Sequence, residues 1–133
     1  MPFKKLFQSA DTPKDGLSQP AREAIVDLLH FCMYADKHIA VSEDEFIEAA
    51  AQTLDWSPLI SYESYEAKST GAVTRALSDP AARVVLLQSI KARLPGEKER
   101  DMALRLAADL MEVDGTQTTA ESKALAEVQA LLK

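Results

Sequence analysis

Two short stretches of the chain place carboxylate residues on either side of a polar loop, a pattern that could either cap helices or bind a cation. The first stretch contains Asp36 and Glu45, and the second contains Asp114 and Glu121. Carboxylate oxygens are the usual ligands of hard cations such as calcium and magnesium. They also accept hydrogen bonds from the unpaired N–H groups of loops and helix starts. We favour a capping role for these residues and expect no cofactor, with a calcium or magnesium site as the alternative.

The second stretch can be compared with the calcium-binding loop of an EF-hand. Asp114, Gly115 and Glu121 would fall at positions five, six and twelve of such a loop. Positions one and three would then be Leu110 and Glu112, and a leucine offers no side-chain oxygen to a cation. A regular EF-hand is therefore excluded, and only an irregular cation site is compatible with these residues.

Other kinds of chemistry receive little support from the residue pattern. His30 and His38 lie eight positions apart, unlike the histidine and cysteine spacings of zinc sites. The lone cysteine, Cys32, falls on an apolar helical face and is interpreted as a small buried hydrophobe. The chain contains no glycine-rich phosphate-binding loop, and no nucleophile, base and orienting group can be assembled from it. We expect a protein that is not an enzyme.

The carboxylate stretches lie between helices that form a repeated hairpin. When Asp36 and Asp114 are superposed, the apolar positions that precede them agree for three turns. The matched pairs are Ile25 with Ala103, Leu28 with Leu106, Leu29 with Ala107, Cys32 with Leu110, and Met33 with Met111. After each loop, Ser42 or Thr118 precedes a glutamate by three positions, which is the pattern of a capping box. The sequence therefore predicts two equivalent helix–loop–helix hairpins, at residues 22–54 and 99–132.

Helical periodicity extends over most of the remaining chain. Proline follows a capping residue at Ser18-Gln19-Pro20, Ser57-Pro58 and Asp79-Pro80, which predicts a helix start at each place. The helix that begins at Ser57 is expected to break at Ser69-Thr70-Gly71, with a further short helix around residues 73–77. No segment shows the strict alternation of a strand. We expect an all-α fold, with a tail or arm at residues 1–16 and a single compact multi-helix domain at residues 17–133.

The composition and the charge pattern restrict the function classes. The net charge of −6 argues against a nucleic-acid-binding protein, because binding to phosphates needs a basic surface. No apolar stretch approaches the ~20 residues that span a bilayer, and the N-terminal segment lacks the apolar core of a secretory signal. Acidic residues dominate positions 36–66 and basic residues dominate positions 75–105, which we interpret as solvated or facing surfaces, with a partner-binding patch as the alternative. We expect a cytoplasmic protein without direct membrane insertion.

Both hairpins resemble the TerB-like tellurite-resistance family, the second more closely than the first. The residues that carry the resemblance are Tyr34-Ala35-Asp36, Val41-Ser42 and Glu45, and then Ala103-Leu104-Arg105-Leu106-Ala107, Val113-Asp114-Gly115 and Glu121. The resemblance covers about residues 21–132, and the first loop departs from the family pattern because it is longer and has Lys37 where glycine is usual. The family implies an all-helical domain that acts in resistance to tellurite and other chemical stress through membrane-associated protein partners, with no established catalysis.

Two functions follow as expectations. We prefer a non-enzymatic helical interaction module that binds protein partners, some of them membrane-associated, in a tellurite-resistance or chemical-stress-response system. The alternative is a divalent-cation-binding sensor that uses the acidic hairpin loops. The sequence makes no prediction of the oligomeric state.

Overall fold

The computed structural model describes residues 17–36, 41–113 and 118–133, and every regular element in these ranges is helical. The α-helices are α2 (Gln19–Met33), α3 (Val41–Thr53), α4 (Tyr62–Ser78), α5 (Pro80–Arg93), α6 (Glu97–Met111) and α7 (Thr119–Leu131). A short 3₁₀ turn, η1 (Tyr34–Asp36), extends the end of α2. The predicted all-α class is confirmed. Among the described helices, none combines the length and the apolar character that a bilayer crossing requires.

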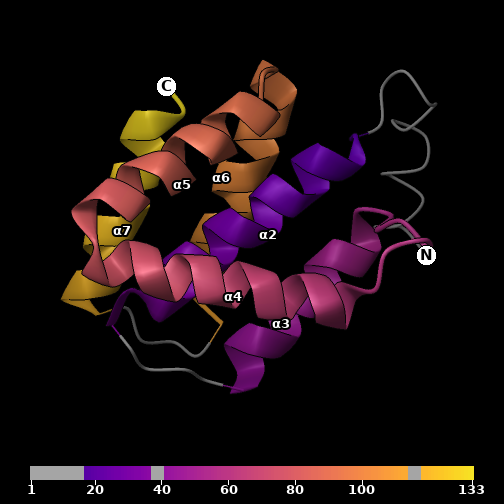
Figure 1. Ribbon diagram of the computed structural model, residues 1–133, viewed down its shortest axis with the longest axis horizontal. Helices are drawn as coiled ribbons and strands as arrows, with labels where there is room; N and C mark the ends of the chain where they lie inside the picture. Colours follow the sequence, from indigo (N-terminus) through magenta and orange to yellow (C-terminus); the bar gives the residue numbers. More distant parts are fainter. Residues whose placement is uncertain (1–16, 37–40, 114–117) are drawn as a thin grey trace.

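Helix α2 lies at the centre of the molecule, in contact with each of the other α-helices (Figure 1). In the view of Figure 1, α5 and α6 lie above it and α4 and α3 lie below it. Every residue from Ala24 to Met33 is buried, including the polar residues Asp27 and His30. A helix at the surface buries the residues of only one side. This helix is buried on all sides, which agrees with the distribution of its apolar residues around the whole helix. The core of the described residues is continuous from α2 outward.

Local capping signals correctly predicted three of the helix starts. Ser18 accepts a hydrogen bond from the Ala21 amide at 3.2 Å, and Asp79 accepts one from the Ala81 amide at 3.0 Å. At α7 the box is reciprocal: the Glu121 amide donates to Thr118 Oγ1 at 3.1 Å, and the Thr118 amide donates to Glu121 Oε1 at 3.0 Å. These bonds satisfy N–H groups that the first turn of a helix leaves without a partner.

The predicted capping box at Ser42 and Glu45 is wrong. Helix α3 includes Val41, so Ser42 lies inside the helix and cannot be its N-cap. The first loop is longer in sequence than the second, so the position of Thr118 does not locate the start of α3. The pairs α2 with α3 and α6 with α7 do occupy the predicted hairpin ranges, and the helices of each pair contact one another. The equivalence of the two hairpins stays a prediction, because residues 37–40 and 114–117 lie outside the described residues, as does the predicted tail at 1–16.

The α3–α4 connection also differs from the prediction. Ser57 accepts a hydrogen bond from the Leu59 amide within a turn, whereas Ser61 caps α4 by accepting one from the Ser64 amide at 3.1 Å. Helix α4 then continues through Gly71 without a break. A single glycine costs a helix only about 1 kcal/mol, and the buried face of α4 outweighs that cost. Inside the connection, Trp56 donates to the Ile60 carbonyl at 2.8 Å, which fixes the turn.

Replacing the confirmed cap should destabilise the protein more than replacing the serine that was predicted to be one. Thr118→Ala is expected to lower the free energy of unfolding by ~0.5–2 kcal/mol, because the Glu121 amide loses its acceptor. Ser42→Ala, at an exposed position inside α3, is expected to change it by less than ~0.5 kcal/mol. Urea denaturation followed by circular dichroism measures both values. Equal losses in the two variants would contradict the helix starts described above.

Candidate functional site

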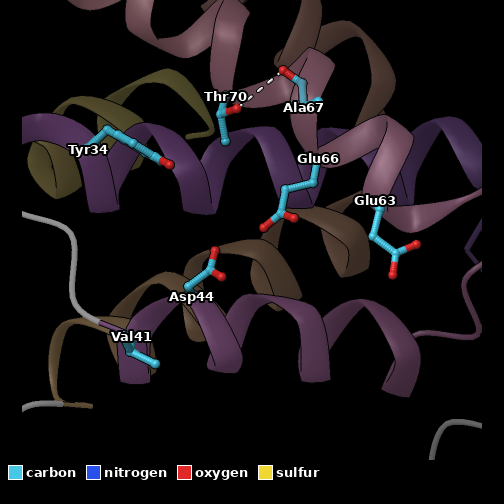
Figure 2. Close-up of a pocket in the computed structure, with 7 residues that line it drawn as sticks. All are labelled: Tyr34, Val41, Asp44, Glu63, Glu66, Ala67 and Thr70. Carbon is cyan, nitrogen blue, oxygen red and sulfur yellow. Dashed lines mark hydrogen bonds between the residues drawn. The ribbon is translucent and has the colours of Figure 1, made fainter.

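A hollow of about 340 Å³ lies between α3 and α4, beside the end of α2. Its lining residues come from three elements: Tyr34 from η1, Val41 and Asp44 from α3, and Glu63, Glu66, Ala67 and Thr70 from α4. Figure 2 shows the carboxylates of Asp44 and Glu66 pointing toward one another across the hollow, while that of Glu63 turns away. The Tyr34 hydroxyl points toward the same pair. The hollow therefore concentrates oxygen atoms in the space between two helices.

A buried histidine adds a nitrogen ligand to this pair of carboxylates. A ring nitrogen of His30 and one carboxylate oxygen each from Asp44 and Glu66 all lie within 4.8 Å of one another. His30 projects from α2 and is fully buried, whereas Asp44 and Glu66 are half-buried. Each of the three residues comes from a different helix, so the packing of α3 and α4 around α2 creates the cluster.

The two nitrogens of the His30 ring have different surroundings. Nδ1 forms a hydrogen bond with Ser69 Oγ at 2.9 Å, and Nε2 is buried without a hydrogen-bond partner among the described residues. Burial lowers the pKa of His30 to about 4, although the negative charges of Asp27 and Asp44 act in the opposite direction. The ring is therefore neutral at neutral pH, with one N–H group and one lone pair.

The Glu66 carboxyl, which faces Asp44, holds a proton more strongly than an isolated carboxyl group does. Burial, a hydrogen bond with Asp44, and the negative charges of Asp44, Glu48 and Glu63 together raise the pKa of the Glu66 carboxyl to about 7. Close carboxylates disfavour double ionisation because like charges repel. The Glu66 carboxyl is therefore about half protonated near neutral pH, and a cation in the same space would compensate the negative charge of the ionised form.

A second, deeper network surrounds Asp27, one turn before His30 on α2. The Asp27 carboxylate is almost fully buried and accepts hydrogen bonds from Ser69 at 2.6 Å, from Tyr65 at 2.9 and 3.0 Å, and from Arg93 at 2.7 Å. Ser69 and Tyr65 project from α4, and Arg93 projects from α5. Because Ser69 contacts both Asp27 and His30, this network is continuous with the cluster that faces the hollow.

The residues predicted as candidate cation ligands do not form this cluster. Glu45 is exposed on α3. Glu121 is buried on α7, where its carboxylate accepts a hydrogen bond from the Thr118 amide. Asp114 and the side chain of Asp36 lie outside the described part of the chain. The capping role of Glu121 is confirmed, and a cation site in the hairpin loops stays untested.

Sequence reasoning missed His30, Asp44 and Glu66, although one signal pointed to them. Asp27 and His30 are polar residues one turn apart within a run of otherwise apolar positions in α2. A buried polar side chain needs a partner, so this pair predicts that polar groups from another element lie against that side of the helix. The spacing between His30 and His38 along the chain gives no information on this face of the helix.

Comparison with protein families, characterised proteins and solved structures adds nothing to the function that the geometry supports. No family model, curated protein or solved structure matches the chain. The resemblance to the TerB-like family, and the role in tellurite resistance that it implies, stay predictions.

Proposed function

We propose that the protein binds a divalent cation between α2, α3 and α4, with His30, Asp44 and Glu66 as its protein ligands. The observation that carries this proposal is the buried Nε2 atom of His30, which has no hydrogen-bond partner among the described residues and belongs to a ring that lies against two carboxylates. An unpaired buried polar group costs about 1–3 kcal/mol, so an arrangement of this kind needs a compensating ligand. A cation accepts electron pairs from all three side chains at once.

The distances fit a metal site after a small adjustment. In a tetrahedral zinc site with bonds of ~2.0–2.2 Å, the ligand atoms lie about 3.3–3.6 Å from one another. The three atoms here lie within 4.8 Å, so a shift of less than about 1 Å by each would bring them to bonding distance. Asp44 and Glu66 are half-buried and border the hollow, which gives their side chains room for that movement.

The hollow leaves one side of the proposed cation open. Three protein ligands complete only part of a coordination sphere, and water occupies the remaining positions in sites of this type. The Tyr34 and Thr70 side chains border that open side, and both carry hydroxyl groups that can bond to such a water. The proposed site is therefore accessible to solvent and to small ligands.

The placement of the ligands suggests how cation binding would affect the protein. Helix α3 packs chiefly against α2 and α6, whereas α4 packs chiefly against α2 and α5. A cation shared by Asp44 and Glu66 would link α3 directly to α4 and remove the repulsion between their carboxylates. This proposal keeps the cation-sensor alternative and moves its site from the hairpin loops to the facing surfaces of helices.

Calorimetric titration of the metal-free full chain with zinc, manganese, calcium and magnesium tests this function. Wild type is expected to bind one cation per chain, and Asp44→Asn and Glu66→Gln are each expected to weaken binding about tenfold or more, because each removes a charged ligand. Glu45→Gln is the matched control, since Glu45 is adjacent to Asp44 but exposed on the outer side of α3. Unchanged binding in Glu66→Gln, or loss of binding only in Glu121→Gln, would contradict the site.

The same titration should depend on pH. A cation must displace the proton of the Glu66 carboxyl, and binding therefore competes with protonation of that group. Because the pKa of Glu66 is raised to about 7, affinity is expected to rise as pH increases through that value and to fall below it. In Glu66→Gln this rise should be absent.

The interaction-module function has separate support from another surface. The outer side of α5 is exposed and uncharged along its length, at Ala81, Val84, Val85, Gln88 and Ala92. Val84 and Val85 are consecutive apolar residues on this side, and they are 60% and 69% exposed. A protein partner stays a prediction that this surface favours, and a role in the chemical-stress response stays a prediction from the sequence resemblance alone.

A further inference from the structure

We propose that Ser69 and Asp27 are positioning residues that keep the Nε2 lone pair of His30 available, and thereby make the site selective for zinc-class transition metals over calcium and magnesium. This inference rests on the cation-binding function proposed above. It concerns residues that touch no cation themselves and act through His30.

The direction of each hydrogen bond in the buried network determines which nitrogen carries the proton. Asp27 is paired with the Arg93 guanidinium at 2.7 Å and acts as an acceptor. The single hydroxyl hydrogen of Ser69 is donated to Asp27 Oδ1 at 2.6 Å. Ser69 Oγ can therefore only accept at its 2.9 Å contact with His30, so the ring donates from an Nδ1–H group.

The remaining ring nitrogen is then a lone-pair donor. A neutral imidazole carries one proton, and the hydrogen bond from Nδ1 fixes the tautomer in which Nε2 has none. The Nε2 atom is buried and has no hydrogen-bond partner among the described residues, and the ring belongs to the cluster with Asp44 and Glu66. The His30 side chain is therefore held as a preformed nitrogen ligand.

The chemistry of the donor set determines which cations it favours. Calcium and magnesium take oxygen ligands, so a nitrogen lone pair in the site offers them little. Imidazole nitrogen together with carboxylate oxygen suits zinc and neighbouring transition metals. In such sites a hydrogen bond to the second ring nitrogen orients the ligand, and here Ser69 connects the ring to the carboxylate of Asp27.

The experiment combines NMR of the labelled imidazole nitrogens with calorimetry on the full chain. In metal-free wild type, His30 is expected to be the Nδ1–H tautomer. Ser69→Ala is expected to shift it toward the Nε2–H tautomer and to weaken zinc binding about 10–100-fold, as other losses of such partners do. Ser69→Thr keeps the hydroxyl and should restore both properties. Ser78→Ala is the matched control, because Ser78 lies on the same helix and its hydroxyl bonds only to α4 carbonyls in the described structure.

The outcomes separate this inference from the function on which it rests. Wild type that binds calcium or magnesium as tightly as zinc would overturn the selectivity and leave cation binding intact. An Nε2–H tautomer in the metal-free wild type, or unchanged zinc affinity in folded Ser69→Ala, would overturn the positioning role. Absence of binding by any of the cations would overturn the proposed function itself. If Ser69→Ala does not fold, Ser69→Cys provides the comparison, since its thiol is a weak acceptor of similar shape.

Discussion

Arg93→Met is expected to lower the free energy of unfolding by about 3–5 kcal/mol, the typical effect of removing one partner of a buried ion pair. The side chain of Asp27 is 6% exposed, and that of Arg93, which is 22% exposed, lies 2.7 Å from its carboxylate. Without the guanidinium, a charged group would remain buried with only hydroxyl donors from Tyr65 and Ser69. Methionine preserves most of the apolar stem of the arginine. The loss of stability therefore reflects removal of the guanidinium charge and not a loss of packing. Urea denaturation measures the change.

A second ion pair of the protein provides a matched control for this prediction. Arg83 lies 2.6 Å from Glu127, but both side chains are about one-third exposed, at 35% and 36%. Solvent screens such a pair, so Arg83→Met is expected to cost only ~0–2 kcal/mol, a range that includes its cation–π contact with Phe31. Adding Asp27→Asn to Arg93→Met should restore part of the lost stability, because no unpaired charge then remains buried. Similar costs in the two arginine variants would show that Asp27 is not isolated from solvent.

Phe31→Ala is expected to lower the free energy of unfolding by about 3–5 kcal/mol, the usual range for truncating a buried aromatic side chain. Phe31 is fully buried on α2, and the Arg83 guanidinium lies over its ring at 5.1 Å from the centroid. The substitution removes apolar burial, leaves a cavity and abolishes the cation–π contact. Thermal and urea denaturation of the purified variant provide the measurement.

The exposed face of α5 offers the comparison for the Phe31 variant. Val85 is 69% exposed, and Val85→Ala is expected to change stability by less than ~0.5 kcal/mol. A cost below about 1 kcal/mol for Phe31→Ala would contradict the central position of α2, because a helix contacted by all the others must tolerate truncation poorly.

The sequence predicts a helix start well where the capping residue and the amide that it binds lie within one turn. Ser18, Asp79 and Thr118 each cap a helix because a side-chain oxygen reaches an amide two or three positions later. Ser57 fails because it serves a turn instead, and Ser61 provides the cap. Ser42 fails because α3 begins before it. A short polar side chain fits several local structures, so neighbouring packing decides among them.

The periodicity of apolar residues determined the all-α class and the central helix. From Ile25 to Met33, apolar side chains occupy positions all around α2, and the structure buries the whole run. The break predicted at Gly71 did not occur, because burial of one face of α4 outweighs the low helix propensity of a single glycine. The all-α fold class therefore follows from the periodicity of apolar residues, whereas the length of each helix also depends on the elements that it packs against.

The candidate site was decided only by the tertiary structure. His30, Asp44 and Glu66 belong to three helices, and no spacing along the chain relates their ligand atoms. The tautomer that we infer for His30 depends on Ser69 and Asp27, which meet across 42 positions of sequence. The sequence shows which side chains are present. The packing of other helices determines which partner each group meets, and the resulting burial and nearby charges determine its pKa. Local pattern therefore determined which helices form, and the packing of α3 and α4 on α2 determined which polar atoms face one another.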